Sequence, residues 1–134
     1  MPRKALDLHC DTLMKLKRSG DLDETAAMVT LKGLQQGNVA LQCFADFVPT
    51  GMYPKPLRKT LSGMVFDKLY RNYQAMMARH RDILFPVLNA SDIDMAGLNG
   101  KIGILLTIED GGVIGDDLKS GKSVKSLMTN SSPR

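Results

Sequence analysis

Two long apolar runs, at residues 39–48 and 101–109, constrain the fold more than any other feature of the sequence. The first reads Val-Ala-Leu-Gln-Cys-Phe-Ala-Asp-Phe-Val and the second reads Lys-Ile-Gly-Ile-Leu-Leu-Thr-Ile-Glu. Runs of this length that end at Pro, Gly or an acidic residue are typical of strands buried on both faces. Helices must then cover both faces of the sheet, so these runs predict an α/β fold with parallel strands.

A long helix is predicted between the two runs, over residues 60–81. Apolar residues recur there at helical spacing, which indicates an amphipathic helix of about six turns. The apolar positions are Leu61, Met64, Val65, Leu69, Tyr73, Met76 and Met77. Basic residues are expected on or near its solvent side: Lys68, Arg71, Arg79 and Arg81. His80 falls at its C-terminal end and is interpreted as a surface or capping histidine.

Shorter elements fill the rest of the chain. The expected ones are a short helix at 30–37 capped by Thr30, an extended segment at 83–88, a helix at 91–98 capped by Ser91, and a helix beginning at 113–119. The order strand, helix, strand, helix, strand predicts βαβ units.

Near the N-terminus, Leu6–Thr12 reads Leu-Asp-Leu-His-Cys-Asp-Thr and alternates apolar and polar residues. This alternation predicts a strand with Asp7, His9 and Asp11 on one face and Leu6 and Leu8 on the other. Packing gives no reason to gather an imidazole and two carboxylates on one face. A metal site or a proton-transfer site gives a reason, because both use an imidazole and carboxylates placed close together.

Glu109 closes the second apolar run and is followed by Asp110-Gly111-Gly112. Parallel α/β folds carry their chemistry at the C-terminal ends of strands. His9, Asp11 and Glu109 therefore form a candidate site built from two strand ends. The alternative is a hydrogen-bonded polar cluster that holds loops without metal. Asp46, also near a strand end, is interpreted as solvated rather than as a support for the site.

Composition excludes several classes of protein. Hydrophobic residues make up 43% of the 134 residues and charged residues 24%, as in ordinary globular chains. No run approaches the roughly 18 apolar residues of a membrane span. No secretory signal is expected before the first strand, so we expect a cytoplasmic protein. Cys10 and Cys43 are too few for a disulfide scaffold and are interpreted as buried free thiols.

The formal net charge of +4 comes from the C-terminal end of the chain. Residues 1–117 contain 14 basic and 14 acidic residues, and only basic ones follow. A neutral body with a basic tail lacks the basic face of a nucleic-acid binder, so neither nucleic acid nor membrane is an expected partner. Residues 120–134 show no periodic pattern and are expected to be poorly ordered.

Three segments carry a resemblance to a known family. They are residues 7–12 (Asp-Leu-His-Cys-Asp-Thr), residues 31–47 with the pattern Leu-x-x-Gly-x-Val-x-x-Gln-x-Phe from Leu34, and residues 100–112 ending in Ile-Glu-Asp-Gly-Gly. Together they resemble the N-terminal portion of the membrane (renal) dipeptidase family of zinc peptidases, over about residues 4–119. The resemblance implies a partial (β/α)8 TIM barrel of the amidohydrolase type, covering about its first three βα units. Residues 1–119 would form this domain.

The resemblance also implies a chemistry. His9 and Asp11 correspond to ligands of the first zinc, and Glu109 corresponds to the carboxylate that bridges two zincs. The family hydrolyses the amide bond of a dipeptide with a metal-bound hydroxide. No catalytic residue beyond the metal ligands is identified.

The sequence departs from the family pattern in its histidines. The family's second zinc takes two histidines from later strands, whereas the one other histidine here is His80, upstream of Glu109. We therefore expect one zinc or none, and an N-terminal fragment that is inactive alone. The alternative is a non-catalytic metal-binding or interaction module whose open sheet edge favours self-association.

Overall fold

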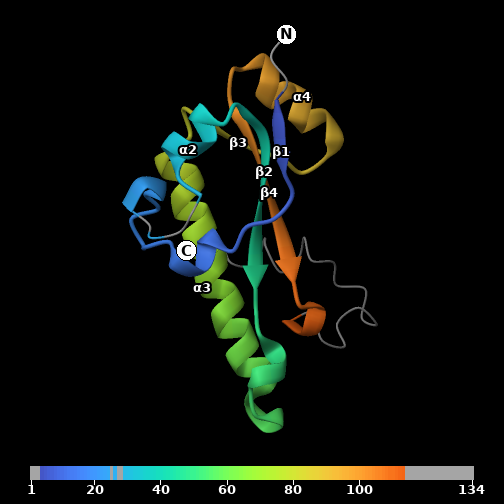
Figure 1. Ribbon diagram of the computed structural model, residues 1–134. Helices are drawn as coiled ribbons and strands as arrows, with labels where there is room; N and C mark the ends of the chain where they lie inside the picture. Colours follow the sequence, from blue (N-terminus) through green and yellow to red (C-terminus); the bar gives the residue numbers. More distant parts are fainter. Residues whose placement is uncertain (1–3, 25, 27–28, 114–134) are drawn as a thin grey trace.

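The computed structural model describes residues 4–24, 26 and 29–113 (Figure 1). Four parallel strands form one sheet in the order β1-β2-β4-β3. The strands are β1 (Ala5–Asp7), β2 (Val39–Phe47), β3 (Leu84–Pro86) and β4 (Ile102–Glu109). The α-helices are α1 (Thr12–Lys15), α2 (Leu31–Gln36), α3 (Arg58–Arg79) and α4 (Ala90–Leu98). The predicted α/β class with parallel strands is confirmed.

The two long apolar runs form the central strands β2 and β4. They pair in register from Leu41 opposite Gly103 to Phe47 opposite Glu109. Their C-terminal ends therefore lie at the same edge of the sheet. The predicted extended segment at 83–88 is the short strand β3, which pairs with the beginning of β4.

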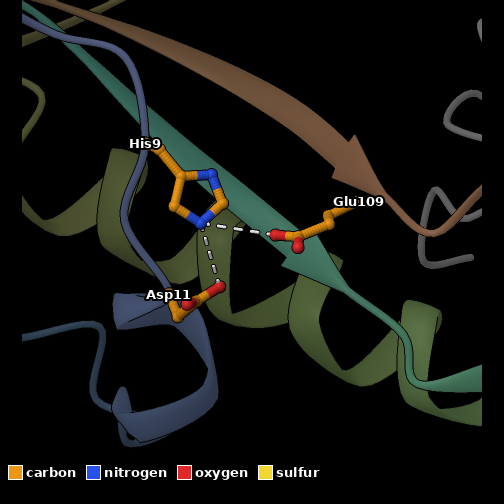
Figure 2. A group of neighbouring side chains, drawn as sticks. All are labelled: His9, Asp11 and Glu109. Carbon is orange, nitrogen blue, oxygen red and sulfur yellow. Dashed lines mark ion pairs between the residues drawn. The ribbon is translucent and has the colours of Figure 1, made fainter.

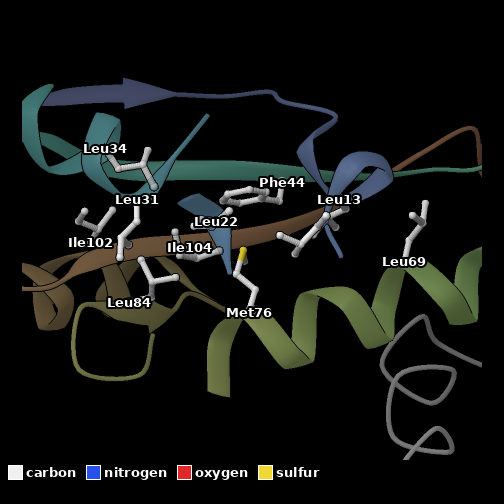
Figure 3. Close-up of a cluster of buried hydrophobic side chains, with 11 residues drawn as sticks. Leu13, Leu22, Leu31, Leu34, Phe44, Leu69, Met76, Leu84, Ile102 and Ile104 are labelled. Atoms are coloured by element: carbon white, nitrogen blue, oxygen red, sulfur yellow. The ribbon is translucent and has the colours of Figure 1, made fainter. Parts of the chain in front are cut away.

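The main core lies between the sheet and α3, α1 and α2 (Figure 3). Phe44, Ile102 and Ile104 point from the central strands into this core and meet Leu69 and Met76 of α3. A smaller cluster on the other side of the sheet joins Leu41, Cys43 and Val87 to Ile93 of α4. Figure 1 shows α3 and α4 on opposite sides of the strands, so both faces are covered, as the apolar runs predict.

The predicted long helix is present but begins at Arg58 and ends at Arg79. Its buried positions are Ser62, Phe66, Leu69, Asn72 and Met76. Met64, predicted to be apolar and inward, is 62% exposed, because the buried stripe passes through Ser62 and Phe66 instead. The apolar pattern identified the helix but misplaced part of its buried face.

The short helices test the capping predictions. Thr30 caps α2 by accepting a hydrogen bond from the Gly33 N–H at 3.0 Å, as predicted. For α4 the predicted cap Ser91 is wrong. Asn89 and Asp92 form a reciprocal capping box, and α4 begins at Ala90. The helix predicted at 113–119 and the tail at 120–134 lie outside the described residues, except that Val113 ends a short 3-10 turn (Gly111–Val113).

The first strand is shorter than predicted. Strand β1 ends at Asp7, and the chain then runs irregularly to Asp11, which precedes α1. Leu6 and Leu8 are largely exposed, at 61% and 70%. The alternating pattern therefore overstated the strand, because sequence alternation alone does not show where ladder pairing stops.

His80 is buried, so its interpretation as a surface residue is wrong. It is 8% exposed and follows the last turn of α3, where its N–H donates to the Met76 carbonyl at 3.1 Å. Its Nε2 accepts a hydrogen bond from the Leu22 N–H at 3.3 Å. The imidazole thus fixes the loop before α2 to the end of α3.

Both cysteines are free thiols, as expected, but only Cys43 is fully buried, whereas Cys10 is half-buried. Burial raises the pKa of both thiols. None of the helices in the described part of the chain is long and apolar enough to span a membrane.

Asp46 is fully buried on β2, which corrects the expectation of a solvated strand end. Neither of its carboxylate oxygens has a hydrogen-bond partner among the residues that the structure describes. Burial, with a smaller contribution from Asp67, raises the pKa of Asp46 to about 7. A buried acid of this kind favours its protonated form.

Asp46→Asn is expected to stabilise the protein at pH 8 by up to about 4 kcal/mol. Because the folded protein holds the proton up to about pH 7 and the unfolded chain releases it near pH 4, wild-type stability falls as pH rises between these values. Urea unfolding at pH 5 and pH 8 measures the effect. The control Asp67→Asn, at an exposed site, should change stability much less. Equal pH dependence in wild type and Asp46→Asn would contradict this account.

Candidate metal centre

His9, Asp11 and Glu109 converge at the C-terminal edge of the sheet (Figure 2). The His9 Nε2 lies 3.5 Å from Asp11 Oδ1 and 3.3 Å from Glu109 Oε2. One donor atom from each residue lies within 4.8 Å of the other two. The structure therefore brings together all three residues that the sequence predicted as ligands, although Glu109 lies about a hundred positions from His9 and Asp11.

The loop after β1 presents His9 and Asp11. The Asp7 side chain, predicted to share their face, instead accepts a hydrogen bond from the His9 N–H at 3.2 Å and holds the turn. The Cys10 carbonyl accepts from the Ala45 N–H at 2.9 Å, so the loop stays attached to β2. Asp11 stands immediately before α1 but makes no side-chain cap. Its carboxylate is left available to the site.

A second loop fixes Glu109. Asp110, which follows it, accepts hydrogen bonds from the Thr50 hydroxyl at 2.6 Å and the Thr50 N–H at 3.0 Å. Its other oxygen accepts from the Gly112 N–H at 3.0 Å. Asp110 has a φ of 67°, in the left-handed region. A Cβ at Gly112 would lie 2.4 Å from the Thr50 hydroxyl, so the second glycine of the segment is required for this close contact.

These hydrogen bonds lower the pKa of Asp110, with the Thr50 hydroxyl as the largest cause. Asp110 is thus a fixed carboxylate that ties the end of β4 to the loop after β2. The pairing of Asp110 with Thr50 was not predicted from the sequence. The signal was available in the Asp-Gly-Gly sequence, since Asp at such a position commonly accepts from a backbone N–H two residues later.

The three clustered side chains remain available to a ligand. Each is about half exposed, at 53%, 53% and 48%. Within the described part of the chain, the carboxylates of Asp11 and Glu109 have His9 as their one polar partner. An imidazole nitrogen and two carboxylate oxygens form a donor set that suits zinc. An open pocket of about 370 Å³ adjoins the cluster, lined by residues that include His9, Asp11 and Lys15.

A parallel α/β sheet with an imidazole and two carboxylates at the C-terminal ends of its strands is the arrangement of an α/β-barrel metallohydrolase. The family model of the membrane dipeptidases, peptidase family M19, matches residues 2–129, and the chain belongs to this family. The family is zinc-dependent and has a TIM-barrel fold, so the predicted partial (β/α)8 barrel is confirmed. At family level the chain is a dipeptidase-like hydrolase. No curated protein matches the sequence significantly.

Thr50→Val is expected to raise the pKa of Asp110, because it removes the shorter of the two hydrogen bonds from Thr50 to that carboxylate. A lowered pKa stabilises the folded state above the ordinary carboxyl range, and this contribution disappears as pH falls. The variant should therefore lose less stability than wild type on acidification. A carboxyl-detected NMR titration measures the pKa directly. Thr50→Ser keeps the hydroxyl and should behave as wild type; the same pKa in all three proteins would refute this role of Thr50.

Proposed function

We propose that His9, Asp11 and Glu109 hold one zinc ion and that the chain is a zinc-binding dipeptidase-type module. The observation that carries the proposal is the convergence of the three donor groups at the C-terminal edge of the sheet. Family membership supports zinc as the metal and a peptide as the class of substrate.

The chemistry of the donor set fits a cation. Two carboxylates directed at one imidazole concentrate negative charge, and a divalent ion offsets it. Three protein donors leave a position open on a four-coordinate zinc, as catalytic zinc sites require. Zinc held there would lower the pKa of a bound water for attack on an amide carbonyl. The adjoining pocket supplies space beside His9 and Asp11 for the substrate.

A second zinc is not part of the proposal. The family's second site needs two further histidines, and this sequence contains two histidines in total. His80 cannot serve because it is buried and its Nε2 accepts from the Leu22 N–H. We infer that the described residues bind a single zinc and that this chain alone does not hydrolyse dipeptides.

Zinc analysis by mass spectrometry tests the site. The purified wild-type chain should contain about one zinc, and His9→Ala and Glu109→Gln should weaken zinc affinity at least on the order of 100-fold. Hydrolysis of a panel of dipeptides, measured on the same samples, should stay at background. Glu24→Gln is the matched control, since Glu24 is the other glutamate of the chain and bonds to Ser19 away from the site.

Two outcomes would contradict the proposal in different ways. Two zincs with turnover would show that ligands beyond this cluster complete the centre. No zinc in wild type, or equal zinc in wild type and Glu109→Gln, would leave the cluster as a hydrogen-bonded structural element. In that case the family fold would be retained without its metal.

A second candidate function is association through the open edge of the sheet. Strand β1 pairs with β2, and its other edge has no strand beside it among the described residues. Leu6 and Leu8 are exposed beside this edge. Unpaired edges with apolar side chains promote pairing between chains, so we propose that two copies of this chain associate here.

Leu6→Lys/Leu8→Lys should shift the chain toward monomer by placing charges beside the edge. Light scattering after size-exclusion chromatography, at a series of concentrations, measures the shift. Met52→Lys/Met64→Lys adds the same charges at exposed apolar sites elsewhere and should leave the association unchanged. A monomeric wild type at all concentrations would rule out this candidate.

A further inference from the structure

A basic groove lies between α3 and the segment that follows α1, away from the residues of the metal centre. It has a volume of about 540 Å³ and is lined by Arg18, Lys68, Arg71, Asn72 and Ala75. Pockets of about 300–1,000 Å³ accommodate small-molecule ligands. The groove shares no lining residue with the three-residue cluster of the proposed zinc site.

One wall and the floor come from a single face of α3. Lys68, Arg71, Asn72 and Ala75 are spaced three, four and seven residues apart, so they lie on neighbouring positions of the helix surface. Asn72 is buried, and its Nδ2 donates to the carbonyls of Leu13 at 3.2 Å and Leu16 at 3.1 Å. The amide therefore holds α1 against α3 and fixes the floor of the groove.

The opposite wall carries Arg18, and three contacts fix the segment that follows it. Gly20 has a φ of +70° and lies so close to α3 that a Cβ there would approach the Ala75 carbonyl carbon to 2.4 Å. Asp21 pairs with Arg79 at 2.6 Å. The Leu22 N–H donates to His80 Nε2. The groove is thus formed by the fold itself before any ligand binds.

The lining concentrates positive charge. Arg18, Lys68 and Arg71 contribute three cations, and none of the described residues that line the groove is a carboxylate. Within the part of the chain that the structure describes, none of these three side chains makes a hydrogen bond or an ion pair. Like charges placed together repel one another, and an anion in the groove would relieve this repulsion.

We propose that this groove binds a small molecule that carries two or more phosphate groups. Two guanidinium groups favour phosphate because their paired N–H donors match its oxygens, and Lys68 adds a third cation. The volume exceeds that of inorganic phosphate and fits a nucleoside diphosphate. The proposal does not depend on the metal centre, since it uses no residue of that cluster.

Isothermal titration calorimetry with ADP and with pyrophosphate tests the groove. All proteins carry His9→Ala and Glu109→Gln, so that phosphate cannot bind to metal at the other site. In this background, saturable binding is expected, and Arg18→Gln/Arg71→Gln should raise the Kd at least tenfold. Lys68→Gln alone should raise it by a smaller factor, which keeps the test valid if the double variant is poorly folded.

The matched control is Lys55→Gln/Lys59→Gln, which removes two charges at exposed positions outside the groove. It should change the Kd less than twofold. Equal weakening in the control would show that net charge alone attracts the anions and would overturn the proposal. Absence of saturable binding, or equal binding of citrate, would overturn it as well, because neither result requires a phosphate site in this groove.

Discussion

The parallel pairing of β2 with β4 is the interaction on which the rest of the structure depends. It joins two runs that are about sixty residues apart and sets Phe47 opposite Glu109. Because strands in a parallel pair end at the same edge, the carboxylate of Glu109 arrives where the loop after β1 presents His9 and Asp11. The core between these strands and α3 stabilises the pairing. The position of Glu109 at the site therefore depends on the packing of this core.

Hydrogen bonds within the loops at this edge fix the positions of the candidate metal ligands. Asp7 holds the turn at His9, and Asp110 joins the end of β4 to Thr50. Asp7 and Asp110 do not belong to the three-residue cluster. Their carboxylates accept hydrogen bonds from backbone N–H groups and, for Asp110, from the Thr50 hydroxyl next to it. Among the described residues, the carboxylates of Asp11 and Glu109 then have His9 alone as a polar partner, and carboxylate oxygens and an imidazole nitrogen are the kinds of ligand that zinc takes.

Periodicity predicted the elements whose side chains pack locally. The strands β2 and β4, the helix α3 and the Thr30 cap of α2 follow from apolar spacing and capping chemistry. Predictions failed where a distant partner decides the outcome. His80 is buried where it accepts a hydrogen bond from the Leu22 N–H, and Asp46 is buried on β2 close enough to Asp67 of α3 for that charge to raise its pKa. The residues near His80 and Asp46 in the sequence do not indicate which distant segment will contact them.

The sequence by itself determined the class of fold and the family, and it predicted His9, Asp11 and Glu109 as candidate metal ligands, because residue type and spacing along the chain carry that information. Only the tertiary structure decided that β1 stops at Asp7, that one ligand atom of each of these residues lies within 4.8 Å of the others, and that three cationic side chains line a groove between α3 and the segment after α1. The physical reason is that strand pairing and helix packing bring together residues that are remote in sequence, and burial and charge depend on those neighbours.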